Sequence, residues 1–264
     1  MKRLFTPDGE AALLETMQRR PLLAFDFDGT LAPIVARPGD ARVPAPVAHR
    51  LQRLASRLPV AVVSGRRVQD VRPRLLFTPW RIVGNHGAED EADDPATGQS
   101  AAHARDLAFA REQLRASADR LRDAGVTVED KVMSFALHYR LASDRDLAQQ
   151  AIADLVRALP TSLAVFGGKM VVNIVAAGAR DKADAVAALV AASGAGAAVF
   201  VGDDVNDEPV FARPEPTWFT VRVGHDDPLS QALYFLDGPA DLPRLLDRML
   251  EALPGSVMEP AAEP

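Results

Sequence analysis

Short runs dominated by apolar residues alternate with helical patterns along this chain, and this alternation constrains its fold more than any other feature. The runs lie at Pro21–Phe25, Val60–Val63, Arg81–Val83 and Ala197–Val201. Between the first two, Ala45–Leu58 has the spacing of an amphipathic helix. Strands that are apolar on both faces are typical of a parallel sheet covered by helices on both sides. The sequence therefore predicts an α/β fold.

The pattern changes between the third and fourth runs, where helix, strand, strand is followed by helix, strand, strand. The expected elements are a helix at His103–Arg122, strands at Val126–Lys131 and Ser134–Tyr139, a helix at Asp144–Leu159, and strands at Leu163–Phe166 and Lys169–Val175. This order predicts a small α+β domain at 95–179, inserted into a core formed by 1–94 and 180–264. The polar stretch 90–99 is expected to be a linker, and the tail 254–264 is expected to fray.

Composition excludes several classes of function. The 264 residues contain no cysteine, which excludes disulfides, thiolate catalysis and cysteine-ligated zinc. The net charge of -6 argues against a nucleic-acid partner. Residues 1–20 carry acidic groups and no continuous apolar stretch, so we expect no signal peptide. We therefore expect a cytoplasmic monomer that binds neither membrane nor nucleic acid.

Acidic residues follow two of the apolar runs directly. Asp26 and Asp28 follow the first run and precede Gly29, while Asp203 and Asp207 follow the last run. The carboxyl ends of parallel strands share one edge of a sheet, where ligands bind. Carboxylates held close together need a cation, and Mg²⁺ prefers oxygen ligands. An Asp-Gly turn and an exposed acidic loop are the alternatives, but both patterns in one chain favour a shared metal site.

Two further positions carry groups that suit a phosphate oxygen. Ser64, Gly65 and Arg66 end the second run with a hydroxyl, an amide and a guanidinium. Lys182 stands just before an alanine-rich helix expected at Ala183–Ala192. Alone, the first is an ordinary Ser-Gly helix cap and the second a surface lysine. Their interpretation as site residues depends on the acidic strand ends that the fold would place beside them.

The order of these motifs resembles the haloacid dehalogenase (HAD) superfamily of phosphatases. Strand-Asp-x-Asp-Gly-Thr, strand-Ser-Gly, lysine and strand-Gly-Asp-Asp-x-x-Asp occur here in that superfamily's order, and the inserted domain resembles its C2-type cap. The stretches Gly84–Glu89, Val128–Lys131 and His138–Arg140 are similar to trehalose-6-phosphate phosphatases. The resemblance implies a HAD-like Rossmannoid core with a cap, and Mg²⁺-dependent hydrolysis of trehalose 6-phosphate through an aspartyl-phosphate.

The resemblance also implies a role for each motif residue. Asp26 would be the nucleophile and Asp28 the general acid and base. The residues that would hold Mg²⁺ are Asp26, Asp28, Asp203 and Asp207. Those that would bind the phosphate are Thr30, Ser64, Gly65 and Lys182. Those that would bind the rest of the substrate are Arg66, Asn85, His86, Glu129, Lys131, Lys169 and Asn173.

Strand parity points to the same cap residues. Alternate residues of a strand face opposite sides, so Glu129 and Lys131 share one face of their strand, and Lys169 and Asn173 share one face of theirs. The apolar face is expected to carry Val126, Val128, Met170, Val172 and Ile174. A polar cap face above the phosphate site could read the hydroxyls of a sugar. The family usually has a glutamate where this chain has Asn173, and asparagine is neutral and shorter.

Three other functions stay open at this point. The substrate could be another sugar phosphate, such as sucrose phosphate or a glycosyl-glycerate phosphate. A signalling receiver module also phosphorylates an aspartate on a parallel sheet, but receivers lack an inserted cap and carry the acceptor on the third strand. A non-catalytic sugar-phosphate sensor is disfavoured by the complete set of catalytic residue types.

Overall fold

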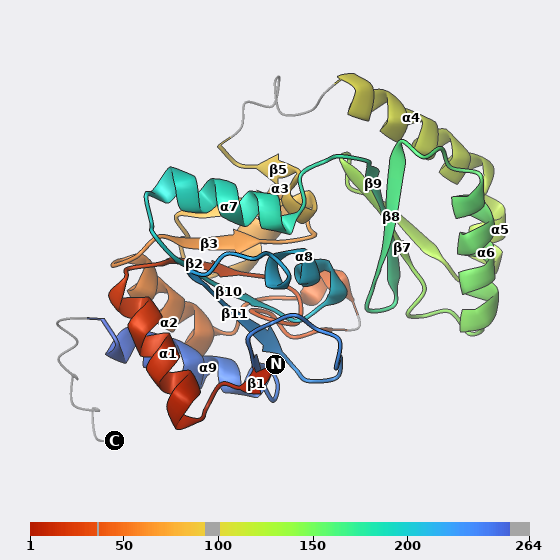
Figure 1. The fold of residues 1–264 in the computed structure, drawn as a ribbon. Coiled ribbons are helices and arrows are strands. Elements are labelled where there is room, and N and C mark those ends of the chain that lie inside the picture. The colour runs from red at the N-terminus through yellow and green to blue at the C-terminus, as the bar shows by residue number, and fades with distance from the viewer. Residues whose placement is uncertain (36, 93–100, 254–264) are drawn as a thin grey trace.

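The computed structural model describes residues 1–35, 37–92 and 101–253, and it contains two sheets. Figure 1 shows the large sheet flanked by helices on both faces, with the small sheet and its helices at one end of the molecule. Both sheets and the inserted position of the smaller one agree with the predicted α/β core and α+β insertion. Among the described residues, none of the helices combines the length and apolar character that crossing a membrane requires.

The large sheet has eight strands in the order β1-β12-β11-β10-β2-β3-β4-β5. Their bounds are β1 Lys2–Arg3, β2 Leu22–Phe25, β3 Val60–Val63, β4 Arg81–Gly84, β5 Glu89–Asp90, β10 Ala198–Gly202, β11 Trp218–Val223 and β12 Tyr234–Leu236. All neighbours are parallel except β4 and β5. The centre of the sheet pairs β2 with β10 and β3, so it joins segments from both sides of the insertion.

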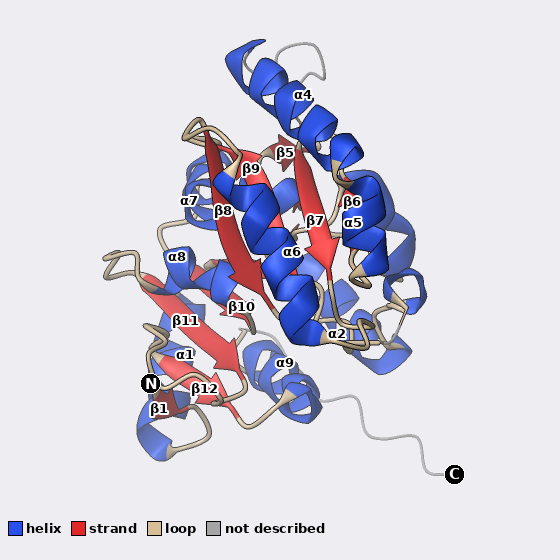
Figure 2. Cartoon of the chain, turned by 90° about the vertical axis from the view of Figure 1, so that its right-hand side faces the viewer, coloured by secondary structure: helices blue, strands red, loops and turns tan. Residues whose placement is uncertain are grey.

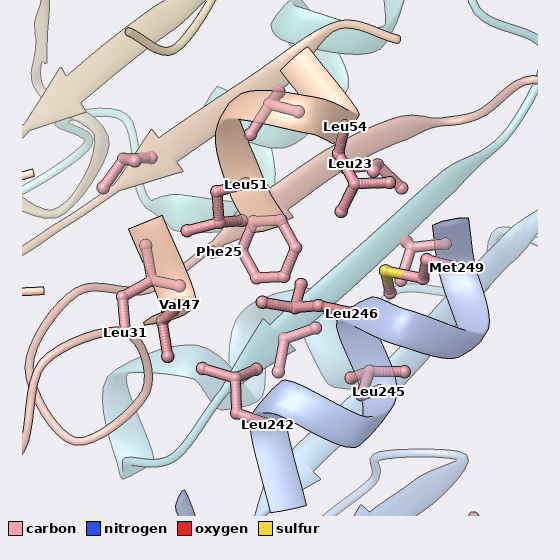
Figure 3. Packing of buried hydrophobic residues seen from close by; sticks show 14 of the residues in the cluster. Leu23, Phe25, Leu31, Val47, Leu51, Leu54, Leu242, Leu245, Leu246 and Met249 are labelled. Carbon is pink, nitrogen blue, oxygen red and sulfur yellow. The ribbon is translucent and has the colours of Figure 1, made fainter. Parts of the chain in front are cut away.

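Helices cover both faces of this sheet because alternate strand residues are apolar on each side. Leu23 and Phe25 of β2 pack with α2 (Ala45–Ala55) and α9 (Leu242–Glu251), as Figure 3 shows. Leu22 and Ala24 face α7 (Lys182–Ser193) and α8 (Glu208–Phe211) on the other side. The remaining core helices are α1 (Pro7–Gln18) and α3 (Val68–Val71). The result is a three-layer core.

The small sheet is antiparallel, with the order β6-β7-β9-β8. Its strands are β6 Thr127–Asp130, β7 Ser134–His138, β8 Leu163–Gly168 and β9 Val171–Ala176. Three helices pack on one face of it, as Figure 2 shows: α4 Ala101–Ala116, α5 Ala118–Asp123 and α6 Arg145–Arg157. Phe135 and Ile174 point into that helical layer, which leaves the other face of the sheet free to meet the core.

The structure corrects some details of the predicted cap. The helix expected at His103–Arg122 is two helices that meet at Ser117. Met170 lies in the turn before β9 with a φ of 64°, so it does not share the strand's apolar face. Val126 joins the cap core, but Val128 is exposed because β6 is an edge strand. The expected linker begins with Asp90, which ends β5, while its residues 93–99 lie outside the described residues, as does the tail at 254–264.

Candidate active site

Asp26 and Lys182 lie together at the carboxyl edge of the large sheet. Asp26 follows β2 and is buried, and Lys182 is the first residue of α7. Asp181 caps this helix by accepting a hydrogen bond from the amide of Asp184, so the helix start is fixed and Lys182 points at the sheet edge. The Nζ of Lys182 donates 2.7 Å hydrogen bonds to Oδ1 of Asp26 and to Oδ1 of Asp207. The structure thus joins motifs that lie far apart in sequence.

The loop after β10 completes an acidic cluster. Asp203 and Asp207 are buried, and Oδ2 of Asp207 accepts hydrogen bonds from the backbone amides of Asp203 and Asp204. Thr30 donates a 3.4 Å hydrogen bond from its hydroxyl to Asp203. Gly29 adopts a φ of 85°, and any side chain there would collide with the Asp203 carboxylate. The approach of the two loops therefore requires glycine at position 29.

Three carboxylates of this cluster are close enough to share one cation. Oxygen atoms of Asp26, Asp203 and Asp207 all lie within 4.8 Å of one another. Burial raises the pKa of Asp26 well above its usual value, with further contributions from Asp207 and Asp203, while Lys182 opposes the shift. Burial likewise raises the pKa of Asp203 to about 6. Buried carboxylates that repel one another offer the oxygen donors and the excess negative charge that a hard divalent cation requires, so the donor set fits Mg²⁺.

The segment after β3 carries Ser64, Gly65 and Arg66, of which Gly65 and Arg66 line a pocket beside the acidic cluster and Ser64 does not. Ser64 is buried, and its hydroxyl accepts a 3.1 Å hydrogen bond from the amide of Arg66. A side chain at Gly65 would strike the ring of His86, so this position also favours glycine. Arg66 binds Asp28 with two hydrogen bonds of 2.6 and 2.7 Å. The structure therefore places Arg66 against the predicted general acid.

A pocket of about 320 Å³ lies between this edge and the polar face of the cap. The predicted site residues among those lining it are Asp26, Asp28, Gly65, Arg66, His86, Glu129, Lys131, Lys169, Asn173 and Asp203. Thr30, Lys182 and Asp207 are bonded to the carboxylates at its floor. The structure thus brings the core motifs and the cap motifs to a single cavity.

The cap contributes charged groups that already have partners. Nε2 of His138 lies 2.9 Å from Glu129, and this hydrogen bond is the main reason why the pKa of Glu129 lies below its usual value. Lys131 is buried, which lowers the pKa of its ammonium, and it donates a 2.9 Å hydrogen bond to the carbonyl oxygen of Gly65. Lys169 donates a 2.6 Å hydrogen bond to Asp203. Two cap lysines therefore hold the cap against the core.

Asn85 is placed differently from the other predicted substrate-binding residues. Its carboxamide donates to Glu89 (2.7 Å) and accepts from the hydroxyl of Ser134 (2.8 Å), which lies in the cap. Among the described residues, those that line the pocket do not include Asn85. Its neighbour His86 does line the pocket, and burial, with Lys131 and Lys182 nearby, lowers its pKa well below the usual value. Asn85 thus links core to cap.

Several pocket residues were not among the predicted site residues. They are Ile34, Val35, Pro38, Thr127, His138, Arg140, Leu141, Val171, Asp204 and Asn206. Strand parity could have found Thr127, because it shares a face with Glu129. His138 and Arg140 lie in a segment that resembles the trehalose-6-phosphate phosphatases. The loop residues carry no periodic pattern, and only the tertiary structure brings them to the cavity.

Comparison with known proteins agrees with this geometry. The family model described as trehalose-phosphatase matches residues 24–240. A trehalose-phosphate phosphatase of Mycolicibacterium paratuberculosis is 35% identical over 251 residues, covering 89% of this chain and 63% of that protein. One of Mycobacterium tuberculosis is 32% identical over 248 residues, covering 89% and 62%. The chain therefore spans less than two thirds of the length of these relatives.

Solved structures show the same fold. The C-terminal domain of the C. albicans trehalose-6-phosphate phosphatase superposes with a TM-score of 0.74 at 21% identity, covering 91% of this chain and 96% of that one. A trehalose-6-phosphate phosphatase related protein gives a TM-score of 0.68 at 21% identity, with 87% and 98% covered. These likenesses confirm the predicted HAD-like core with an inserted cap. From the matched family model and these relatives, the chain belongs to the trehalose-phosphatase family.

Proposed function

We propose that this chain is a Mg²⁺-dependent phosphatase that hydrolyses trehalose 6-phosphate to trehalose and inorganic phosphate. The observation that carries the proposal is the buried carboxylate of Asp26, which Lys182 holds beside Asp203 at the floor of a pocket roofed by polar cap residues. A carboxylate in this setting suits nucleophilic attack on phosphorus. Membership of the trehalose-phosphatase family supports the same chemistry.

The proposed reaction has two displacements. In the first, a carboxylate oxygen of Asp26 bonds to phosphorus, the bond from phosphorus to the sugar oxygen breaks, and Asp28 gives that oxygen a proton. In the second, Asp28 takes a proton from water as the water oxygen attacks phosphorus. The bond between phosphorus and Asp26 then breaks, which releases phosphate. Each residue ends in its starting state.

The charges of the site suit a phosphoryl group in transfer. Asp26 and Asp203, with the backbone carbonyl of Asp28, would hold Mg²⁺, and Asp207 stands behind them. When bound, the ion would offset the negative charge shared by the carboxylates and the phosphate. The ammonium of Lys182, which is bonded to Asp26, would offset part of the same negative charge. Thr30, Ser64 and Gly65 would donate hydrogen bonds to the phosphoryl oxygens.

The cap would select the sugar. Glu129, Lys131, Lys169 and Asn173 line the cap side of the pocket, where we expect a sugar attached to the phosphate to lie. Carboxylate, ammonium and carboxamide groups can all bond to hydroxyls. Asn173 is buried. Its carboxamide could bond to a hydroxyl of the sugar, but it is neutral and shorter than the glutamate that the family usually has at this position. This departure keeps a second sugar phosphate in consideration.

Phosphate release from a panel of substrates tests the proposal. The purified chain would be given trehalose 6-phosphate, sucrose phosphate and a glycosyl-glycerate phosphate, with Mg²⁺ and after chelation, and Asp26→Asn serves as the control. We expect trehalose 6-phosphate to be hydrolysed fastest, chelation to stop turnover and added Mg²⁺ to restore it. If another sugar phosphate is hydrolysed faster, that compound is the substrate in place of trehalose 6-phosphate. If a sugar phosphate binds but is not hydrolysed, the chain is a sensor.

The proposal that the protein is monomeric and cytoplasmic rests on its composition alone.

A further inference from the structure

Arg66 makes an unusually complete set of contacts beside the pocket. Its Nε and Nη2 donate to the two oxygens of Asp28, at 2.6 and 2.7 Å. A second hydrogen bond from Nη2 reaches the carbonyl oxygen of Pro38, and Nη1 donates to Asp70 at 2.8 Å. Since a guanidinium has five N–H groups, these four bonds leave little of it for a sugar.

The guanidinium is also held rigidly. Its side chain is only 12% exposed, and its Cζ lies 5.3 Å from the centre of the Phe27 ring. Asp70 is fixed from its other side by Arg74, which donates to the same carboxylate. The Asp28 side chain, in contrast, is 41% exposed at the pocket wall. A rigid, planar fork therefore grips a carboxylate that would otherwise be free to change rotamer.

We propose that Arg66 is a positioning residue that sets where the carboxylate of Asp28 stands, and that it is not a ligand of the sugar. This inference rests on the proposed function, because it assumes that Asp28 delivers the proton to the departing sugar oxygen. Two parallel hydrogen bonds fix both the distance and the plane of the carboxylate, which a single ammonium cannot do. Proton delivery depends on that placement to within fractions of an ångström.

The leaving group separates this role from a general structural one. A sugar alkoxide is a poor leaving group and needs the proton, whereas p-nitrophenolate leaves without it. Misplacing Asp28 should therefore slow the first displacement with trehalose 6-phosphate far more than with p-nitrophenyl phosphate. Hydrolysis of the phosphoenzyme also uses Asp28, so release of the leaving group must be followed in a single turnover.

The experiment compares Arg66→Lys, which keeps the charge and loses the fork, with Arg74→Lys, which makes the same change on the other side of Asp70. For Arg66→Lys we expect single-turnover release of trehalose to slow by about 10-fold to 100-fold. Release of p-nitrophenolate should change by less than about threefold, and so should KM for the sugar phosphate. Arg74→Lys should leave the ratio of the two rates unchanged.

The outcomes are distinguishable. Equal slowing of both substrates by Arg66→Lys, a change in KM alone, or the same pattern in Arg74→Lys would overturn the positioning role. If the wild-type chain prefers another sugar phosphate, the comparison is made with that substrate and keeps its meaning. If the wild-type chain turns over no sugar phosphate at all, the proposed function itself fails, and the role of Arg66 fails with it.

Discussion

Two lysines approach the acidic cluster, one from the core and one from the cap, and their surroundings differ. Lys182 is 1% exposed and bonded to both Asp26 and Asp207. Lys169 is 35% exposed in the turn between β8 and β9, and it is bonded to Asp203. Burial alone would lower the pKa of either ammonium, but the carboxylates overcome that effect and raise both. The core lysine belongs to the same domain as the carboxylates that it binds, whereas the cap lysine reaches its carboxylate from the other domain.

Removal of the core lysine should have the largest effect. In Lys182→Met, Asp26 and Asp207 lose a partner while staying buried, and breaking a buried ion pair costs about 3–5 kcal/mol of unfolding free energy. Turnover should fall below detection because the phosphoryl group also loses its charge partner. Denaturant unfolding and phosphate release measure the two effects. Lys169→Met serves as the control, with a smaller stability loss of about 1–2 kcal/mol, because this lysine is partly exposed although Asp203 is buried. Equal destabilisation by the two variants would contradict the comparison.

The next largest effect should appear in the cap, and only with a sugar. Glu129→Ala removes a carboxylate from the pocket wall, and a lost hydrogen bond to a charged group is worth about 10-fold to 100-fold in kcat/KM. Activity on p-nitrophenyl phosphate should change little, because that substrate has no hydroxyls to bind. The matched control is Asp130→Ala on the same strand, since Asp130 pairs with Arg111 on the far side. A similar loss with both substrates would move Glu129 out of the sugar site.

His86 lies at the contact between core and cap, and it should make the stability of the protein depend on pH. Its ring meets the edge of Phe166 in the cap at 5.0 Å, and burial depresses its pKa far below 6.5. The native state keeps the ring neutral while the unfolded chain takes up a proton below pH 6.5. Stability therefore falls as pH falls, by at most about 1.4 kcal/mol per pH unit from this group.

The measurement compares unfolding free energies of the wild type and His86→Gln from pH 7.5 to 5.5. The wild type should lose more stability than the variant over this range. The raised pKa of Asp203 acts in the opposite direction, since its buried charge is relieved by protonation, but it is common to both proteins and cancels. A difference between the two proteins that does not vary with pH would show that His86 is not held neutral.

The smallest effect concerns the cation. Lys169 places a positive charge on Asp203, one of the three carboxylates that could hold Mg²⁺. Removing that charge in Lys169→Met should tighten Mg²⁺ binding by about threefold to tenfold, since partly exposed charges interact weakly. Calorimetric titration measures it without any substrate. Lys131→Met is the control, because Lys131 contacts the carbonyl of Gly65 and no carboxylate of the cluster. Weaker Mg²⁺ binding in Lys169→Met would contradict the claim that the charge of Lys169 opposes the cation.

Much of the core site was predictable because it depends on strand ends. The runs before Asp26, Ser64 and Asp203 are apolar on both faces, which identifies buried parallel strands, and such strands end at a common edge. The roles that we propose for these residues come from the family resemblance. Parity placed Glu129 and Asn173 on the correct face because an alternating strand permits only two choices.

The remainder depended on contacts between segments far apart in the chain. Nothing local in the sequence indicates that Arg66 grips Asp28, or that Asn85 bonds to Ser134 in the cap. The short edge strand β1 has no apolar pattern of its own and exists because it pairs with β12. The break at Ser117 likewise falls inside an uninterrupted helical pattern.

The pairing of β2 with β10 at the centre of the large sheet has a consequence for how the chain folds. These strands lie on opposite sides of the whole cap, so the core cannot close its sheet until the chain beyond the cap is available. The cap sheet, in contrast, is formed by one continuous stretch. A cap that has already folded brings its two ends together, which shortens the effective loop and reduces the entropy lost when β10 docks. Folding should then begin in the cap and finish in the core, so that Asp26 and Asp203 come together last.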